Sequence, residues 1–136
     1  MACVFCDIAG GTLDACRVLE NDEVIAFLDR SPLFPGHTLV IPRRHVVTLD
    51  QVEPALMATL MATVQRVMRA VVIATGAQGT FIANNNVVSQ SVAHLHVHVV
   101  PRTKGDGLKG FFWPRHKYAS DEAMTEMAAK VRDALV

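Results

Sequence analysis

The chain has 136 residues, of which 51% are hydrophobic and 19% are charged, a balance typical of one folded domain rather than of a disordered segment. Thirteen Lys and Arg residues balance thirteen Asp and Glu residues, so no overall field favours nucleic acid or an anionic membrane. We therefore expect a single domain over residues 1–136, with neither nucleic acid nor membrane as a partner.

Hydrophobic periodicity and turn residues predict seven elements. In chain order, these are strands at 17–20, 23–29 and 37–41, a helix at 54–75, strands at 80–84 and 93–100, and a final helix after Ser120. Pro54 suits the first turn of the long helix and Gly76 lies just past its end. Ser120 can cap the final helix, whose first turn is acidic. This order, with short connections, predicts an α+β fold: an antiparallel sheet with helices on one side.

The amino terminus and the three cysteines indicate a reducing compartment. The first residues show no basic segment and no long apolar segment, and Asp7 is an early acid, unlike a secretory signal. No uncharged apolar run reaches the roughly 20 residues of a transmembrane helix. An odd number of cysteines is a poor basis for a disulfide framework. We expect a soluble, cytoplasmic protein.

Cys3 and Cys6 have the two-residue gap that lets two thiolates reach one metal ion. A redox pair would normally begin a helix in a βαβ context, which the sequence does not indicate here. The alternative is two free thiols near a frayed end. Cys16 has no partner motif, and we expect a small, buried residue.

Three of the six histidines stand at alternate positions: His94, His96 and His98. Alternate side chains of a strand share a face and lie about 6.6 Å apart, so the imidazoles form a row while the apolar residues between them enter the core. Imidazole can ligate a metal or attack phosphorus as a nucleophile. Neutral hydrogen-bonding residues at 84–91 favour the second chemistry, because they can hold a phosphate. The alternative is a solvated polar face.

The segment from Gln90 to Val100 closely resembles the signature of the histidine triad (HIT) superfamily of nucleotide hydrolases and transferases. Residues 5–8, 26–29, 35–42 and 43–45 resemble further blocks of the family in the family order, and 105–107 with Trp113 resemble the tail of bacterial members. The resemblance implies a HIT domain over 1–136 that folds as a five-stranded antiparallel sheet with two helices and forms a homodimer.

The implied activity releases a nucleoside monophosphate through a covalent nucleotidyl-histidine. His96 would be the nucleophile, His98 would contact the phosphate oxygens, and His37 would complete the cluster. Asp29 would hold the ribose hydroxyls of an AMP-like purine nucleotide. The other implied contacts are Phe5, Ile8, Phe27, Leu28 and Leu39 at the base, and Asn85, Gln90 and Ser91 at the phosphate or leaving group.

These residues also have simpler explanations. Asp29 could cap a turn, His37 could begin a strand, and the apolar residues could belong to the core. The three consecutive asparagines at 84–86 could be turn formers. Ser89 stands where family members usually have Gly, which would permit a positive φ.

A zinc-binding branch of the superfamily has a similar cysteine pair, completed by a histidine after the Ile-Pro-basic-basic block and by the first triad histidine. Those positions are His45 and His94, so the resemblance implies a structural zinc site of Cys3, Cys6, His45 and His94. A histidine bound to zinc there is unable to shuttle protons, which leaves the chemistry to the other two triad members.

Three functions fit the sequence. The first is a nucleotide phosphoramidase or dinucleoside polyphosphate hydrolase, the second is a nucleotide-binding module with little turnover, and the third is a hydrolase whose triad binds catalytic zinc. A nucleic-acid platform on the basic and aromatic segment 102–117 is disfavoured, because a charge run is more often a solvated face.

Overall fold

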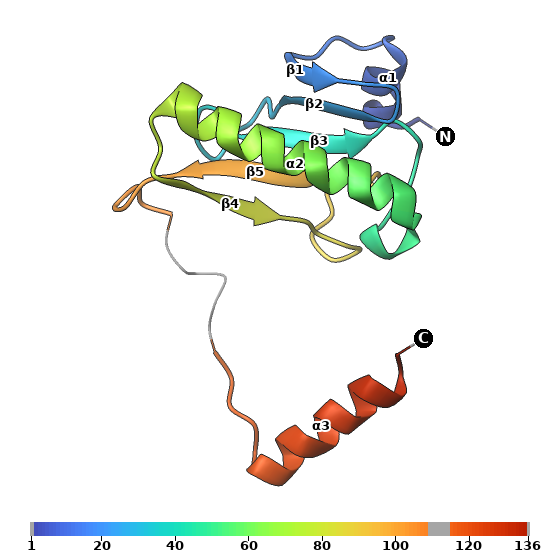
Figure 1. Cartoon of the computed structure of the whole chain (residues 1–136), viewed down its shortest axis with the longest axis vertical. Helices are drawn as coiled ribbons and strands as arrows, with labels where there is room; N and C mark the ends of the chain where they lie inside the picture. The colour runs from blue at the N-terminus through green and yellow to red at the C-terminus, as the bar shows by residue number, and fades with distance from the viewer. Residues whose placement is uncertain (1, 109–114, 136) are drawn as a thin grey trace. The chain divides into compact units, whose positions relative to one another are not determined.

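The computed structural model describes residues 2–108 and 115–135, and these residues divide into two compact units, the first ending at Asp106 and the second beginning at Gly107 (Figure 1). The first unit contains α1 (Val4–Gly10), β1 (Arg17–Glu20), β2 (Val24–Leu28), β3 (Thr38–Pro42), η1 (Leu49–Gln51), α2 (Pro54–Thr75), β4 (Gly79–Ala83) and β5 (Val97–Arg102), and the second contains α3 (Asp121–Asp133). A single domain over 1–136 stays a prediction.

The five strands form one antiparallel sheet in the order β1-β2-β3-β5-β4, which confirms the expected α+β fold. The expectation of helices on one side is wrong: α2 packs on the face of Ala26 and Val40, whereas α1 packs on the face of Phe27 and Leu39. The two central neighbours, β3 and β5, are far apart in sequence, and their pairing places Leu39 opposite His98. The strand that follows His37 therefore lies beside the histidine row.

Helix α2 packs along the sheet and has the bounds that the periodicity predicted (Figure 1). Its buried stripe and the sheet residues around it form the main core, in which Leu60, Val64 and Val67 are almost fully buried. Burying each such side chain stabilises the fold by about 1.5–3 kcal/mol. Gly76 ends the helix at a left-handed φ of 70°, and its N–H donates to the Val72 carbonyl at 2.9 Å. By length and composition alone α2 is apolar enough to cross a membrane, but its buried stripe belongs to the core.

The short helix α1 at the amino terminus adds an element that the sequence did not predict. Seven residues are too few to show a helical period and too few to be stable alone. Cys3 caps α1 by accepting a hydrogen bond from the Cys6 N–H at its Sγ, 3.3 Å away. The cysteine pair therefore belongs to an ordered helix rather than to a frayed end.

Two arginines hold α1 against the sheet. Arg17 donates to the Ile8 carbonyl and Arg43 donates to the Ala9 carbonyl, each at 2.8 Å. Both guanidinium groups also pair with Glu20, at 2.7 and 2.9 Å. These contacts satisfy carbonyls that the end of a helix leaves without partners, so the tertiary structure stabilises this short helix.

Helix α3 begins as predicted. The Ser120 hydroxyl accepts a hydrogen bond from the Ala123 N–H at 3.1 Å, acidic residues occupy the first turn and basic residues the last. The residues at 109–114, among them Trp113 and much of the basic and aromatic segment, lie outside the described part of the chain.

Candidate active site and metal centre

The histidine row lies at the start of β5. Only His98 belongs to the strand, because β3 pairs with Val97 to Val99, whereas the N–H of Leu95 donates instead to the Val46 carbonyl at 2.7 Å. The alternation persists beyond the strand, with Leu95, Val97 and Val99 in the core. His94 and His96 are 0% and 2% exposed, which excludes the solvated polar face.

His96 is held in one tautomer by the backbone. Its Nδ1 lies 2.8 Å from the carbonyl oxygen of His94, which can only accept, so Nδ1 carries the proton. In the neutral ring, Nε2 then holds the lone pair of a nucleophile. The side chain of Asn84 donates to the His96 carbonyl at 3.0 Å and ties the preceding loop to this residue.

His37 and His98 form a hydrogen-bonded pair with a defined direction. The Leu33 N–H donates to His37 Nδ1 at 3.0 Å, so the proton of neutral His37 lies on Nε2. That Nε2 is 2.9 Å from Nδ1 of His98 and donates to it. The proton of His98 therefore lies on Nε2, as a donor beside His96, whose ring centre is 5.0 Å away.

Burial keeps this pair neutral. It lowers the pKa of His98 to about 4, helped by the nearby His96 and His37 and opposed by Asp29. Burial also lowers the pKa of His37, again against Asp29, whose Oδ2 lies 3.7 Å from His37 Nε2. Both rings therefore remain uncharged donors and acceptors at neutral pH.

We expect acid to destabilise the fold through His98. An ordinary histidine pKa of 6.5 becomes about 4 in the folded chain, so the unfolded chain binds this proton first as the pH falls. The free energy of unfolding should therefore fall from pH 6.5 toward pH 4, by at most about 3 kcal/mol from this group. Urea unfolding at several pH values, with His98→Asn beside the wild type, measures it. The same pH slope in both proteins would contradict the assignment.

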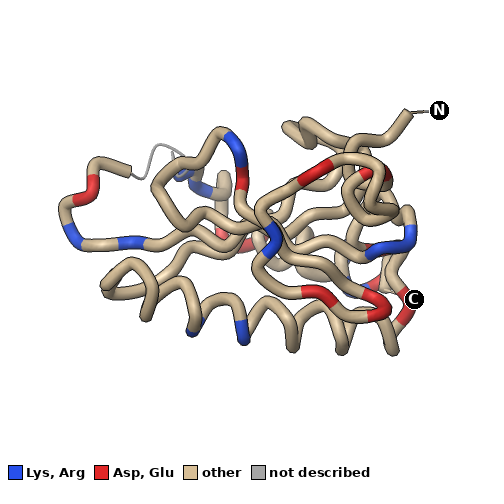
Figure 2. Tube along the Cα trace, turned by 90° about the horizontal axis from the view of Figure 1, so that it is seen from above, with Lys and Arg blue, Asp and Glu red and all other residues tan. Residues whose placement is uncertain are grey.

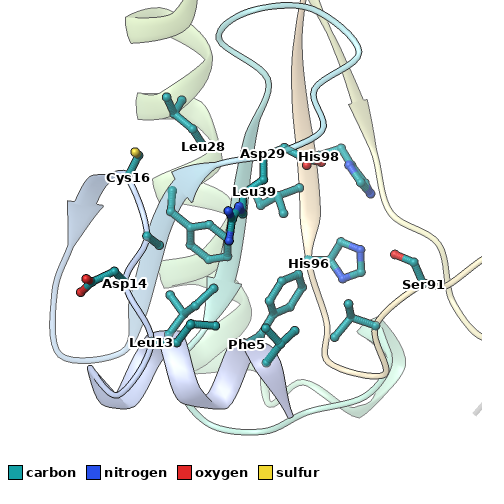
Figure 3. A pocket seen from close by; sticks show the side chains of 16 residues that line it. Phe5, Leu13, Asp14, Cys16, Leu28, Asp29, Leu39, Ser91, His96 and His98 are labelled. Carbon is teal, nitrogen blue, oxygen red and sulfur yellow. The ribbon is translucent and has the colours of Figure 1, made fainter.

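A cavity of about 400 Å³ opens in front of the histidines (Figure 3). Figure 3 shows His96, His98 and Ser91 on one side of it and Cys16 and Asp14 on the opposite side. The structure brings nine of the expected site residues into its lining: Phe5, Ile8, Phe27, Leu28, Asp29, Leu39, Ser91, His96 and His98. Three further residues expected at the site do not line this cavity: His37, Asn85 and Gln90.

The loop before the row is held mainly by its own side chains. Gln90 donates to the Val47 carbonyl at 2.6 Å and accepts from the Val87 N–H at 3.0 Å. Among the described contacts, the exposed Asn85 has no side-chain hydrogen bond. Ser89 adopts a φ of 61°, so the serine takes the left-handed backbone for which Gly is the usual residue.

Sequence reasoning missed part of the cavity wall. The loop 13–16 carries no motif, and it reaches the cavity because the Leu28 N–H donates to the Cys16 carbonyl at 2.9 Å. Cys16 is exposed, so the expectation of a buried residue is wrong. Arg30 also lines the cavity, and its position next to Asp29 was a signal that could have found it. The remaining missed lining residues are Val4, Leu13, Asp14, Ala15 and Val92.

Four possible metal ligands lie close together, and one of them is the first histidine of the row. One donor atom from each of Cys3, Cys6, His45 and His94 lies within 4.8 Å of the others. Nδ1 of His94 is 3.5 Å from both sulfur atoms, and Nδ1 of His45 is 3.2 Å from Cys6 Sγ. Two sulfurs and two imidazole nitrogens at such spacing form a donor set that suits tetrahedral zinc.

The protonation of these groups also fits a metal. Nε2 of His94 lies 2.8 Å from the Pro42 carbonyl and must donate to it, so the Nδ1 lone pair faces the sulfurs. Burial lowers the pKa of His94, which keeps the ring neutral. Burial and the Cys3 thiol raise the pKa of Cys6 to about 11, so binding of a metal there must release a proton.

Comparisons with known proteins find similar sequences and structures over most of the chain. The family model of the HIT domain matches residues 11–105. An adenylylsulfatase of Arabidopsis thaliana is 32% identical over 96% of this chain and 68% of its own length. An adenosine 5′-monophosphoramidase of Schizosaccharomyces pombe is 28% identical over 97% of this chain and 100% of its own length.

Two solved structures are similar over almost their whole length. A HIT family protein of Bacillus subtilis has a TM-score of 0.92 and 32% identity, and the match covers 100% of this chain and 99% of that chain. A zinc-bound histidine triad family protein of Mycobacterium smegmatis has a TM-score of 0.75 and 36% identity, with 99% of each chain covered.

Proposed function

Because the chain belongs to the HIT family, we propose that it is a nucleotide hydrolase that releases a nucleoside monophosphate from a phosphoramidate or a dinucleoside polyphosphate. The observation that carries this proposal is His96, whose Nδ1 is anchored on a carbonyl while its ring lines the cavity. Two relatives support a nucleotide hydrolase: one is named an adenosine 5′-monophosphoramidase and the other an adenylylsulfatase.

In the first step, the Nε2 lone pair of His96 attacks the α-phosphorus and forms a P–N bond. The bond to the leaving group breaks, and its electron pair departs with that group, which takes a proton from solvent. The His96 ring becomes positive, and its Nδ1–H bond to the His94 carbonyl strengthens accordingly. The Nε2–H of His98 donates a hydrogen bond to the phosphate oxygens. Water then attacks the phosphorus, and His96 leaves as a neutral ring with release of a proton.

The rest of the cavity would hold the nucleoside. One oxygen of Asp29 accepts from the Ser31 N–H at 2.9 Å and caps a turn, and we propose that the other binds the ribose hydroxyls. Ser91, which lines the cavity, is a better candidate for the phosphate or leaving group than Gln90 or Asn85. The purine would lie against the five expected apolar residues: Phe5, Ile8, Phe27, Leu28 and Leu39.

We also propose that Cys3, Cys6, His45 and His94 hold a structural zinc ion. Bound there, the metal would supply a cross-link between α1, the segment after β3 and the histidine row. The backbone carbonyl of His94 orients His96, so a zinc site that fixes His94 in place would also fix the orientation of the nucleophile.

The test is release of nucleotide from adenosine and guanosine 5′-phosphoramidates by the wild-type protein, followed by a diadenosine polyphosphate. Turnover of any of these substrates supports the proposal. Binding of AMP in calorimetry without any turnover would contradict it and favour a nucleotide-binding module.

We also propose that this protein works in the cytoplasm, with a purine nucleotide and a second copy of the chain as partners and with neither nucleic acid nor membrane.

The homodimer that the resemblance implies has a suitable surface in the first unit. The outer side of α2 is largely apolar, with Met61 at 41% and Ile73 at 83% exposure. The charged residues of α2 are Arg66 and Arg69, both basic, and Figure 2 shows the rest of this helix in tan. Strand β4 forms one edge of the sheet, and an edge has backbone groups available for pairing with another chain. We propose that these two elements form the dimer interface.

The double variant Met61→Glu/Ile73→Glu should therefore convert the dimer to a monomer, because four carboxylates would be buried across a two-fold interface. Light scattering after size exclusion would show half the mass of the wild type. Val18→Glu, at an exposed apolar residue of the opposite edge strand β1, is the matched control and should remain dimeric. A monomeric wild type, or a dimeric double variant, would contradict this interface.

A further inference from the structure

Arg30 is a charged residue of the cavity wall to which neither the proposed catalysis nor the proposed nucleoside contacts assign a role. Among the described residues that line the cavity, Arg30 is the one that is either Lys or Arg, and its side chain is exposed. Arg17, Arg43 and Arg102 are each held by a carboxylate. In the described part of the chain, by contrast, no hydrogen bond or ion pair engages the guanidinium of Arg30. Its donors are therefore available to a molecule in the cavity.

Arg30 lines the same cavity as Asp29, the proposed ribose contact, whereas the reacting phosphate belongs at His96 and His98. A nucleotide with its phosphate at His96 and its ribose at Asp29 must extend its base away from the histidines. Arg30 follows Asp29 directly in the chain, so its guanidinium is in reach of that base.

The chemistry of a guanidinium favours one class of base. Its planar fork of N–H donors matches two adjacent acceptors, and it also stacks well on aromatic rings. Guanine and hypoxanthine present such a pair at O6 and N7, whereas adenine presents N7 beside an N6 amino donor. An arginine beside the base therefore attracts a 6-oxopurine and meets an unfavourable donor on adenine.

We infer that Arg30 is a specificity-determining residue that makes this cavity prefer 6-oxopurine nucleotides over adenine nucleotides. The inference rests on the proposed function, since it takes the cavity to be the nucleotide site. It concerns the base alone and changes no step at the phosphorus.

The experiment compares kcat/KM for guanosine, inosine and adenosine 5′-phosphoramidates in the wild type, Arg30→Met and Arg30→Gln. We expect the wild type to prefer guanosine over adenosine by about 10-fold or more, and inosine to behave like guanosine because it shares O6 and N7. Both variants should bring these ratios close to one by losing rate on the 6-oxopurines. Arg132→Met, at an exposed arginine of α3 outside the cavity lining, is the matched control and should keep the wild-type ratios.

Calorimetric dissociation constants for GMP, IMP and AMP separate this inference from the proposed function. If neither the phosphoramidates nor a diadenosine polyphosphate is hydrolysed, the proposed function fails, and the affinity ratios of wild type and variants decide the role of Arg30 by the same criterion. Turnover with equal rates on all three substrates would overturn the inference and leave the hydrolase intact. A guanosine preference that survives in both variants, or inosine behaving like adenosine, would also overturn it.

Discussion

Replacing His96 by alanine is expected to reduce nucleotide release by at least about 10⁴-fold, because His96 supplies the lone pair that attacks phosphorus in the covalent route. In the structure, the ring of His96 lines the cavity and its tautomer is fixed by the His94 carbonyl. The neighbouring His98 has its Nδ1 occupied by His37 and its Nε2 protonated, so it offers a donor rather than a lone pair. Chromatographic detection of the released monophosphate measures the loss.

The fold of the His96→Ala variant must be verified separately. The substitution leaves the buried His94 carbonyl without its partner, at a cost of about 1–3 kcal/mol, which a folded domain of this size can tolerate. Circular dichroism and urea unfolding test this. A denaturing quench of the wild type, followed by mass spectrometry, should find one nucleotidyl group on the peptide that contains His96. Equal release by wild type and variant, or a nucleotidyl group on a different residue, would refute the assignment.

Removal of the metal ligands is expected to have the second large effect. The double variant Cys3→Ser/Cys6→Ser should lose bound zinc and several kcal/mol of unfolding free energy, because a closed site of this kind contributes its binding energy to folding. Metal analysis should find one zinc ion per chain in the wild type, and thermal unfolding should shift to lower temperature in the variant or with a chelator. Turnover should fall together with the fold, because the His94 carbonyl orients His96.

Cys16→Ser provides the matched control for this experiment. Cys16 is an exposed thiol outside the ligand cluster, so its replacement should leave zinc content and melting temperature unchanged. A double variant that keeps its zinc would exclude the cysteine site. Loss of turnover on chelation with an unchanged melting temperature would instead favour a catalytic metal on the second cluster of possible ligands, Asp29, His37 and His98.

The elements that could be predicted from the sequence are those whose signal is local. The bounds of α2, the cap of α3 and the alternation around His96 all depend on residues within a few positions of one another. The same holds for the cysteine pair, whose spacing alone indicated a metal. The family motifs extended the prediction to site residues that are distant in the chain, such as Asp29, which lines the cavity with the histidines.

Tertiary structure decided which of these groups meet and in which protonation state. The pairing of β3 with β5 sets His37 against His98, and a carbonyl far along the chain, that of Pro42, determines which nitrogen of His94 faces the cysteines. Gln90 has an amide side chain of the kind that often contacts ligands, but its amide hydrogen-bonds to the backbone of Val47 and Val87 instead. Sequence by itself thus determined the elements and the kinds of side chain at the site. Hydrogen bonds and burial link residues through space, so only the folded chain determined which nitrogen is free to react.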